Sequence, residues 1–430
     1  MKRKVEAQLI AWKNKSSERQ PLLVNGARQV GKTYILRKFG EEQFKNVLYV
    51  NLETNLTIAS YFNDNIAPER LLRYLEASTG ERIIAGETLI FFDEIQSCER
   101  ALTSLKYFCE ETPEFHIAAA GSLLGVAINR QHYSFPVGKV ETITMYPLDF
   151  EEYLWARGKE FLASEIRSAF ETMIALPDAL HAEATELYRE YLLIGGMPAS
   201  INAFLRSGSF LDVSLVQNEI LDNYIADMAK YATNTDSVKI RACYNSIPAQ
   251  LAKDNRKFQY KVVQKGGSAS LFGASIEWLY LAGVVLKCQR ISQAFEPISV
   301  YADLSAFKLY MGDVGLLTAK SGLSQQTVLS GEGNTFMGAV TENYVAQQLA
   351  ANGHDLYYWE SNNTAELDFV LQRGNQVMAI EVKKGEHVRS RSLNLFIGTY
   401  HPSCAIRLSL KNFGEKDGLK SVPLYAAFCI

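Results

Sequence analysis

The sequence is poor in the residues that build disulfide frameworks and metal clusters. It contains six cysteines among 430 residues; they are scattered, and no two stand at the spacing of metal ligands. The six histidines are equally dispersed. We therefore expect a chain that is stabilised by ordinary hydrophobic cores and kept in a reducing cytoplasm.

Long apolar runs and an excess of charge of one sign are also absent. The longest nearly apolar stretch, Leu279 to Leu286, is far too short to span a bilayer. The basic start of the chain is interrupted by Glu6 and Gln8, so we expect neither a signal peptide nor a membrane anchor. The 44 Lys and Arg residues against 47 Asp and Glu residues give a net charge of -3, which excludes a global basic field for nucleic acid.

The composition is that of a globular protein, with 47% hydrophobic and 21% charged residues. A chain of this length favours two or three domains rather than one core. Changes in the local pattern predict three regions, which are residues 1–148, 149–330 and 331–430. We predict the α/β class, with a parallel sheet first, a helical middle region and a second α/β domain last.

The first region alternates apolar runs with helix-like stretches. Four short runs are apolar on both faces and bounded by turns or polar residues: PLLVNG, NVLYVNL, TLIFFDE and FHIAAAG. Runs of this kind are typical of a buried parallel sheet with helices on both sides.

The middle region begins with helix-like patterns, including a long run from Ala163 to Leu193 that Gly195, Gly196 and Pro198 end. Helices over 238–251 and 270–285, followed by a strand, have the order of a winged helix. From Gly331 onward the pattern predicts a helix, three strands, a helix and a strand.

A phosphate-binding motif lies between the first predicted strand and a helix. It comprises Gly26, Ala27, Arg28, Gln29, Val30, Gly31, Lys32 and Thr33. The glycines let the main-chain N–H groups curl around a triphosphate, Lys32 reaches the terminal phosphates, and the Thr33 hydroxyl holds magnesium. The alternative is a glycine-rich turn with a solvated lysine.

A second motif supplies the acidic residues that such a site needs. The apolar strand TLIFF ends in Asp93, placed to coordinate magnesium, and Glu94, placed to orient the attacking water. Ser122 follows the next strand and is interpreted either as a contact to the γ-phosphate or water, or as a helix N-cap.

With these motifs the chain resembles AAA-type ATPases of bacteria and archaea. The likeness also includes FDEIQ, the tract from Ser134 to Lys139, YPLDFEEYL, GGMP and FKLYMGDVGLL. Members of this group bind ATP and carry a C-terminal domain of unknown function, so the resemblance implies ATP and Mg²⁺ as ligands. It also places Lys139 where relatives carry a basic residue, which is either a phosphate sensor or an ordinary exposed lysine.

The sequence does not identify an arginine finger, for which Arg28 and Arg130 are the candidates. It also leaves homo-oligomer formation and single-subunit action both open.

Carboxylates gather in a predicted β-hairpin near the C-terminus. Glu381 and Lys383 share one face of the second strand, and Asp368 on the first strand lies beside them. Two carboxylates and an ammonium at one place favour a bound Mg²⁺ or Mn²⁺, with the lysine positioning water. Glu342 on the preceding helix could complete the set.

This arrangement resembles the PD-(D/E)XK nuclease superfamily. The resemblance implies Glu342, Asp368, Glu381 and Lys383 as catalytic residues, with Asp368 and Glu381 as metal ligands. Leu367 stands where the family motif has proline. The alternatives are an exposed cross-strand salt bridge and a degenerate domain that binds without cleaving.

Two basic runs are candidate contacts for DNA phosphates. The first comprises Lys253, Arg256, Lys257, Lys261 and Lys265, and the second comprises Lys383, Lys384, His387, Arg389 and Arg391. Either run could instead be a solvated face.

The sequence thus predicts an ATPase whose nucleotide state controls a C-terminal nuclease-like domain acting on DNA. The rival interpretation is a nucleotide-dependent switch or scaffold with an inactive C-terminal domain. A third is DNA binding without catalysis, which would weaken steeply with salt.

Overall fold

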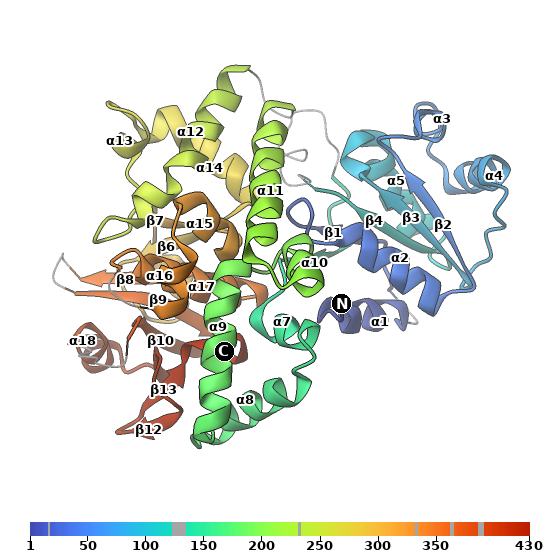
Figure 1. Cartoon of the computed structure of the whole chain (residues 1–430). Coiled ribbons are helices and arrows are strands. Elements are labelled where there is room, and N and C mark those ends of the chain that lie inside the picture. The colour runs from blue at the N-terminus through green and yellow to red at the C-terminus, as the bar shows by residue number, and fades with distance from the viewer. Residues whose placement is uncertain (16–17, 123–134, 231–233, 332–333, 362–364, 386–390) are drawn as a thin grey trace. The chain divides into compact units, whose positions relative to one another are not determined.

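A computed structural model describes residues 1–15, 18–122, 135–230, 234–331, 334–361, 365–385 and 391–430. The chain forms two compact units (Figure 1). The N-terminal unit comprises Lys2–Tyr146 with Leu281–Gly283, and the C-terminal unit comprises Pro147–Tyr280 and Val284–Ile430 together with Met1. No helix in these ranges is long and apolar enough to cross a bilayer. All six cysteines are free thiols.

The N-terminal unit is built on a parallel sheet of five strands in the order β2-β3-β4-β1-β5. The strands are β1 (Leu22–Asn25), β2 (Asn46–Asn51), β3 (Thr88–Asp93), β4 (His116–Ala120) and β5 (Glu141–Thr144). The first four are the four predicted strands, whereas β5 was not predicted. Every residue of β3 and β4 is buried, as expected for a sheet that is covered on both faces.

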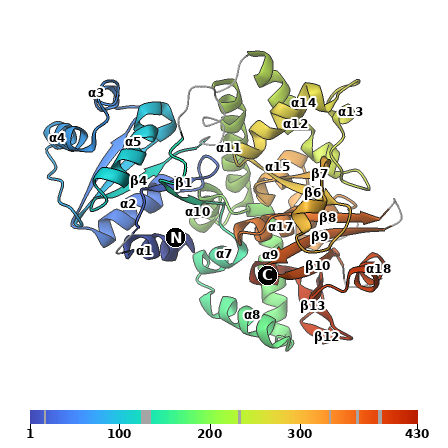
Figure 2. The ribbon, with the colours of Figure 1, turned by 180° about the vertical axis from the view of Figure 1, so that it is seen from behind.

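Helices cover both faces of this sheet (Figure 2). On one side α1 (Val5–Lys13) and α2 (Lys32–Gln43) pack, and Trp12 and Phe39 contact each other there. On the other side α3 (Leu56–Ser60), α4 (Pro68–Thr79) and α5 (Glu99–Glu111) bury a core in which the rings of Phe92 and Phe108 contact each other. A short 3₁₀ turn, η1 (Ile95–Ser97), follows β3.

The C-terminal unit contains a mixed sheet of eight strands in the order β12-β13-β11-β10-β9-β8-β6-β7. Its strands are β6 (Val285–Ile291), β7 (Ala302–Met311), β8 (Tyr357–Ser361), β9 (Ala365–Arg373), β10 (Gln376–Val382), β11 (Cys404–Ser409), β12 (Gly414–Lys416) and β13 (Leu419–Pro423). The predicted hairpin is formed by β9 and β10, which are antiparallel across the turn at Gly374. Because β6 and β7 belong to the same sheet as β8 to β13, strands from the predicted regions 149–330 and 331–430 share one sheet.

Helices make up most of the remaining C-terminal unit. They are α7 (Phe150–Ala156), α8 (Glu160–Thr172), α9 (Asp178–Ile194), α10 (Pro198–Ser207), α11 (Phe210–Lys230), α12 (Asn234–Leu251), α13 (Tyr260–Val263), α14 (Ala269–Leu281), α15 (Val314–Ser321), α16 (Gln325–Ser330), α17 (Met337–Ala351) and α18 (Arg391–Tyr400). The unit also contains two 3₁₀ helices, η2 (Ile298–Tyr301) and η3 (Leu424–Cys429). A capping box at Asp149 begins α7.

Two predicted helices have wrong bounds. The run from Ala163 to Leu193 is two helices, because Met173 adopts a left-handed conformation and Pro177 precedes α9. The helix over 270–285 ends at Leu281, because Gly283 has a φ of +71° and Val285 already lies in β6. The predicted helix, turn, helix and strand correspond to α12, the segment before α14, α14 and β6, and the short helix α13 lies in the predicted turn. The winged-helix interpretation stays a prediction.

The motifs GGMP and GDVG meet in the core of the C-terminal unit. The buried Asp313 carboxylate accepts hydrogen bonds from the Gly196 N–H (2.6 Å) and the Leu316 N–H (3.0 Å). Burial raises the pKa of Asp313 to about 6, and these hydrogen bonds lower it in part. The Gly196 carbonyl in turn accepts from the Leu148 N–H at 2.7 Å. Both motifs therefore have a structural role, which is to join three distant segments.

Candidate functional site

The glycine-rich loop connects the end of β1 to the start of α2. Gly26, Gln29 and Gly31 have positive φ angles of +141°, +65° and +97°, so the backbone curls as a phosphate-binding loop requires. A Cβ at position 26 would lie 2.2 Å from the Met145 carbonyl oxygen. Only glycine therefore fits at the first position of the loop.

Lys32 begins α2 and extends along the inside of the loop. Its ammonium donates hydrogen bonds to the carbonyls of Gly26 (2.9 Å) and Ala27 (2.8 Å), and the residue is 7% exposed. Burial lowers the pKa of Lys32 to about 8, with Glu94 and Asp93 partly opposing the shift. The ammonium is thus held where it could reach phosphates bound by the loop.

Thr33 and Asp93 lie together at the C-terminal end of the sheet. The Thr33 hydroxyl donates to Asp93 Oδ2 at 2.9 Å, and the Tyr49 hydroxyl donates to the same oxygen at 3.0 Å. One hydroxyl and one carboxylate form the partial ligand set that suits Mg²⁺, since this ion takes its other ligands from water and substrate phosphates. The two residues could therefore bind a magnesium ion that is also coordinated by the phosphates of a nucleotide.

Glu94 follows Asp93 directly, in a left-handed conformation with a φ of +51°. Its carboxylate accepts a hydrogen bond from the side-chain amide of Gln96, which is buried. A positive φ in a non-glycine residue is costly and is often found at functional sites. The sequence predicted no role for Gln96, although this residue stands two positions after Glu94 in FDEIQ.

Ser122 lies at the end of β4 and contacts the loop. The Arg28 Nε donates to the Ser122 hydroxyl at 3.3 Å, and Ser122 is 1% exposed. The residues that would test an N-cap role for Ser122 lie outside the described residues, as does Arg130. Lys139 forms an ion pair with Glu110 at 3.0 Å, which agrees with an ordinary surface lysine.

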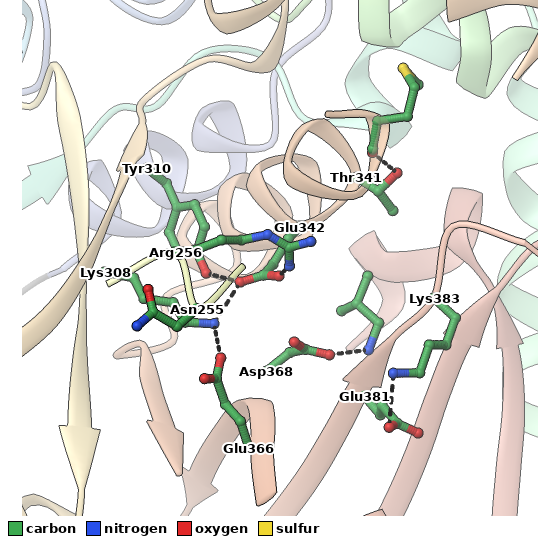
Figure 3. A network of polar contacts seen from close by, with 12 residues as sticks. Asn255, Arg256, Lys308, Tyr310, Thr341, Glu342, Glu366, Asp368, Glu381 and Lys383 are labelled. Carbon is green, nitrogen blue, oxygen red and sulfur yellow. Dashed lines mark hydrogen bonds and ion pairs between the residues drawn. The ribbon is translucent and has the colours of Figure 1, made fainter. Parts of the chain in front are cut away.

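The four residues of the predicted C-terminal site fall into two groups (Figure 3). Glu381 and Lys383 form an ion pair at 3.0 Å. Asp368, opposite on β9, accepts a hydrogen bond from the Val382 N–H at 2.7 Å. Glu342 on α17 instead contacts Lys308, Arg256 and Tyr310.

A metal cluster is not evident in this region. Within the described ranges no group of three His, Cys, Asp or Glu residues is arranged to hold a metal ion. The buried Glu381 Oε2 accepts no hydrogen bond from any described residue, so Asp368 and Glu381 remain the two candidate ligands.

The first basic run is partly occupied by ion pairs. Arg256 pairs with Glu342 and Lys257 pairs with Glu360, so these two cations are not available as the predicted phosphate contacts. Lys253, Lys261 and Lys265 are exposed. In the second run, His387 and Arg389 lie outside the described residues.

Three family models match successive parts of the chain. Residues 18–154 match a family described as AAA domain. Residues 185–327 match a domain of unknown function (DUF8612), and residues 337–427 match a domain of unknown function (DUF4143).

Two mycobacterial proteins share a short stretch with this chain. They are the uncharacterized protein Rv2008c of Mycobacterium tuberculosis and the uncharacterized protein Mb2031c of Mycobacterium bovis, each 35% identical over 79 residues. The match spans 18% of this chain and 18% of each relative.

Solved structures give distant likenesses. The Walker-type ATPase PABY2304 of Pyrococcus abyssi has 16% identity and a TM-score of 0.45 over 74% of this chain and 95% of that chain. The ORC2 protein of Aeropyrum pernix has 11% identity and a TM-score of 0.37 over 80% and 95%.

The AAA-domain match covers the glycine-rich loop, Asp93 and all five strands of the parallel sheet. Its position agrees with the topology and the loop geometry found in the N-terminal unit. Residues 18–154 are therefore similar to the AAA domain family, and the N-terminal unit has a P-loop NTPase-like α/β fold with a parallel sheet.

Proposed function

We propose that this protein is a Mg²⁺-dependent ATPase of the cytoplasm. The observation that carries the proposal is the convergence of Lys32, Thr33 and Asp93 at the C-terminal end of one parallel sheet, with Glu94 directly after Asp93. In open α/β sheets, ligands bind at the carboxyl ends of the strands.

The residues of the loop would divide the work of binding ATP. The N–H groups from Gly26 to Gly31 surround the phosphates, and the Lys32 ammonium neutralises charge on the terminal ones. Thr33 and Asp93 would hold Mg²⁺, which supplies positive charge to the transferring phosphoryl group. Glu94 accepts the proton of the attacking water, and Ser122 orients that water or the γ-phosphate.

Calorimetry with ATP and Mg²⁺ tests the binding part of the proposal. We expect wild-type protein to bind ATP and Lys32→Ala to bind it about 10- to 100-fold more weakly, because a charge-assisted contact to phosphate contributes about 1.5–3 kcal/mol. Lys106→Ala, which removes an exposed lysine from α5 of the same unit, is the control and should bind like the wild type. A folded wild-type protein that binds no adenine nucleotide would refute the proposal.

ATP binding should also depend on pH, because the pKa of Lys32 is about 8. Bound phosphates favour the ammonium, so the pKa of Lys32 rises in the complex and binding takes up a proton when the free protein has lost it. From pH 8 upward we expect the Kd to rise, by at most about tenfold per pH unit. Calorimetry between pH 7.5 and 9.5, in two buffers of different ionisation enthalpy, measures both effects. Lys32→Met should show no such proton uptake, and a pH-independent Kd in the wild type would contradict the assignment.

We further propose that the nucleotide state controls the C-terminal, nuclease-like unit. Two versions differ in what this unit does. In the first it cleaves DNA with Glu342, Asp368, Glu381 and Lys383; in the second it is a catalytically inactive switch or scaffold. The pairing of Glu342 with Lys308 and Arg256 favours the second version.

Incubation of plasmid and linear DNA with Mg²⁺ or Mn²⁺, with and without ATP, separates the two versions. Cleavage that Asp368→Ala abolishes would establish the first version. Intact DNA under all conditions, from a protein that hydrolyses ATP, would support the second.

A further inference from the structure

A buried carboxylate and a buried ammonium meet in the core of the C-terminal unit. Glu342 on α17 and Lys308 on β7 have side chains that are 1% and 0% exposed. The Lys308 Nζ lies 2.8 Å from Glu342 Oε1 and 2.6 Å from Glu366 Oε1 on β9. One lysine thus bridges two carboxylates that come from a helix and a strand (Figure 3).

A second cation completes the surroundings of Glu342. The Arg256 guanidinium contacts Glu342 Oε2, and the Tyr310 hydroxyl donates to Oε1. Gly338 makes room for the guanidinium, because a Cβ there would lie 2.8 Å from Arg256 Nη2. Glu342 Oε1 therefore accepts hydrogen bonds from Lys308 and Tyr310, and Oε2 forms an ion pair with Arg256.

The charges in this cluster balance without any other ion. Glu342 and Glu366 contribute two negative charges, and Lys308 and Arg256 contribute two positive charges. A divalent ion would bring the same positive charge, but it would leave the Lys308 ammonium buried without a partner, at a cost of several kcal/mol. The predicted metal set of a nuclease therefore does not fit at Glu342.

We propose that Lys308 and Arg256 take the place of a divalent metal ion at Glu342 and Glu366. Glu342 is then a structural anion that fixes α17 to β7 and β9. The carboxylates Asp368 and Glu381 lack the helix carboxylate that the resemblance to nucleases implies. This proposal concerns the C-terminal unit alone and does not depend on nucleotide binding.

The proposal is tested by removing the Lys308 ammonium and supplying a divalent metal ion in its place. In full-length protein without nucleotide, we expect Mn²⁺ to leave the melting temperature of the wild type unchanged. Lys308→Met should melt at a lower temperature, and Mn²⁺ at about 100 times its Kd should raise that temperature by about 5 °C or more, because the two carboxylates then have only the Arg256 guanidinium to balance them. Lys308→Gln, which keeps a polar side chain between the two carboxylates, is a milder variant that should gain the same dependence if Lys308→Met does not fold.

Lys257→Met is the matched control, since Lys257 pairs with Glu360 instead of Glu342; it should gain no Mn²⁺ dependence. Electron paramagnetic resonance counts bound Mn²⁺ directly. The proposal is overturned if wild-type protein binds Mn²⁺ and Glu342→Gln abolishes that binding, or if a folded Lys308→Met or Lys308→Gln variant remains insensitive to Mn²⁺. Mn²⁺ bound in the N-terminal unit would remain bound in Glu342→Gln. None of these results tests ATP hydrolysis, which is measured separately.

Discussion

Glu94→Gln should lower the rate of ATP hydrolysis by about 10²- to 10⁴-fold, which is the usual contribution of a general base. Glutamine has nearly the same size and can still accept a hydrogen bond from Gln96, but it cannot take a proton from water. ATP binding should change little, because Lys32 and the loop amides remain. Steady-state hydrolysis gives the kcat, and calorimetry gives the Kd for ATP.

Two further variants make this result specific to Glu94. Gln96→Ala removes the amide that donates a hydrogen bond to the Glu94 carboxylate. It should therefore lower kcat, by less than Glu94→Gln does, and leave KM nearly unchanged. Glu69→Gln changes an exposed carboxylate in the first turn of α4 and should have no effect. Full hydrolysis by Glu94→Gln would show that another group activates the water.

The sequence predicted the N-terminal unit well because its signals are local. Buried strands are apolar throughout, and the loop needs glycines at positions where φ is positive. The edge strand β5 was missed because its sequence ETIT alternates in polarity and only Ile143 is buried. Tyr49 was missed for a different reason: its contact with Asp93 joins neighbouring strands that are 44 residues apart in the chain.

In the C-terminal unit, local sequence patterns did not predict the long-range partners of the charged residues. The hairpin of β9 and β10 was predicted from alternation and a turn, but the partners of Glu342 come from β7 and from the segment before α13. Lys308 lies 34 residues before Glu342, within the otherwise apolar stretch FKLYM. A charged residue in such a stretch was the one available signal of a buried ion pair.

Helix α17 was predicted as a helix, but its sequence did not show that its polar side chains are buried. Thirteen of its 15 residues are buried, including Glu342, Asn343 and Gln347. Asn343 and Gln347 accept hydrogen bonds from the main-chain N–H groups of Met311 (2.7 Å) and Val314 (2.8 Å). Long-range bonds of this kind let polar side chains lie in a core without a large energetic cost.

Gly196→Ala should destabilise the C-terminal unit by about 3 kcal/mol or more, the range typical of overpacking and broken buried hydrogen bonds. A Cβ at this position would lie 2.0 Å from the Leu148 carbonyl oxygen and 2.8 Å from the Leu148 nitrogen. These are backbone atoms, and the Leu148 N–H is itself bound to the Gly196 carbonyl at 2.7 Å. Neither segment can move away without also disturbing the bond between Gly196 N–H and Asp313. Urea unfolding of full-length protein measures the change.

Gly273→Ala provides the matched control in the same unit. Gly273 lies within α14, and a Cβ there would meet nothing within 4 Å, so alanine should stabilise the helix by up to about 1 kcal/mol. If Gly196→Ala unfolds at the same urea concentration as the wild type, the junction of GGMP with GDVG does not hold the core together. Those motifs would then need a functional explanation in place of the structural one. If the two alanine variants instead shift stability in opposite directions, the crowding at Gly196, and not the loss of glycine flexibility, accounts for the effect.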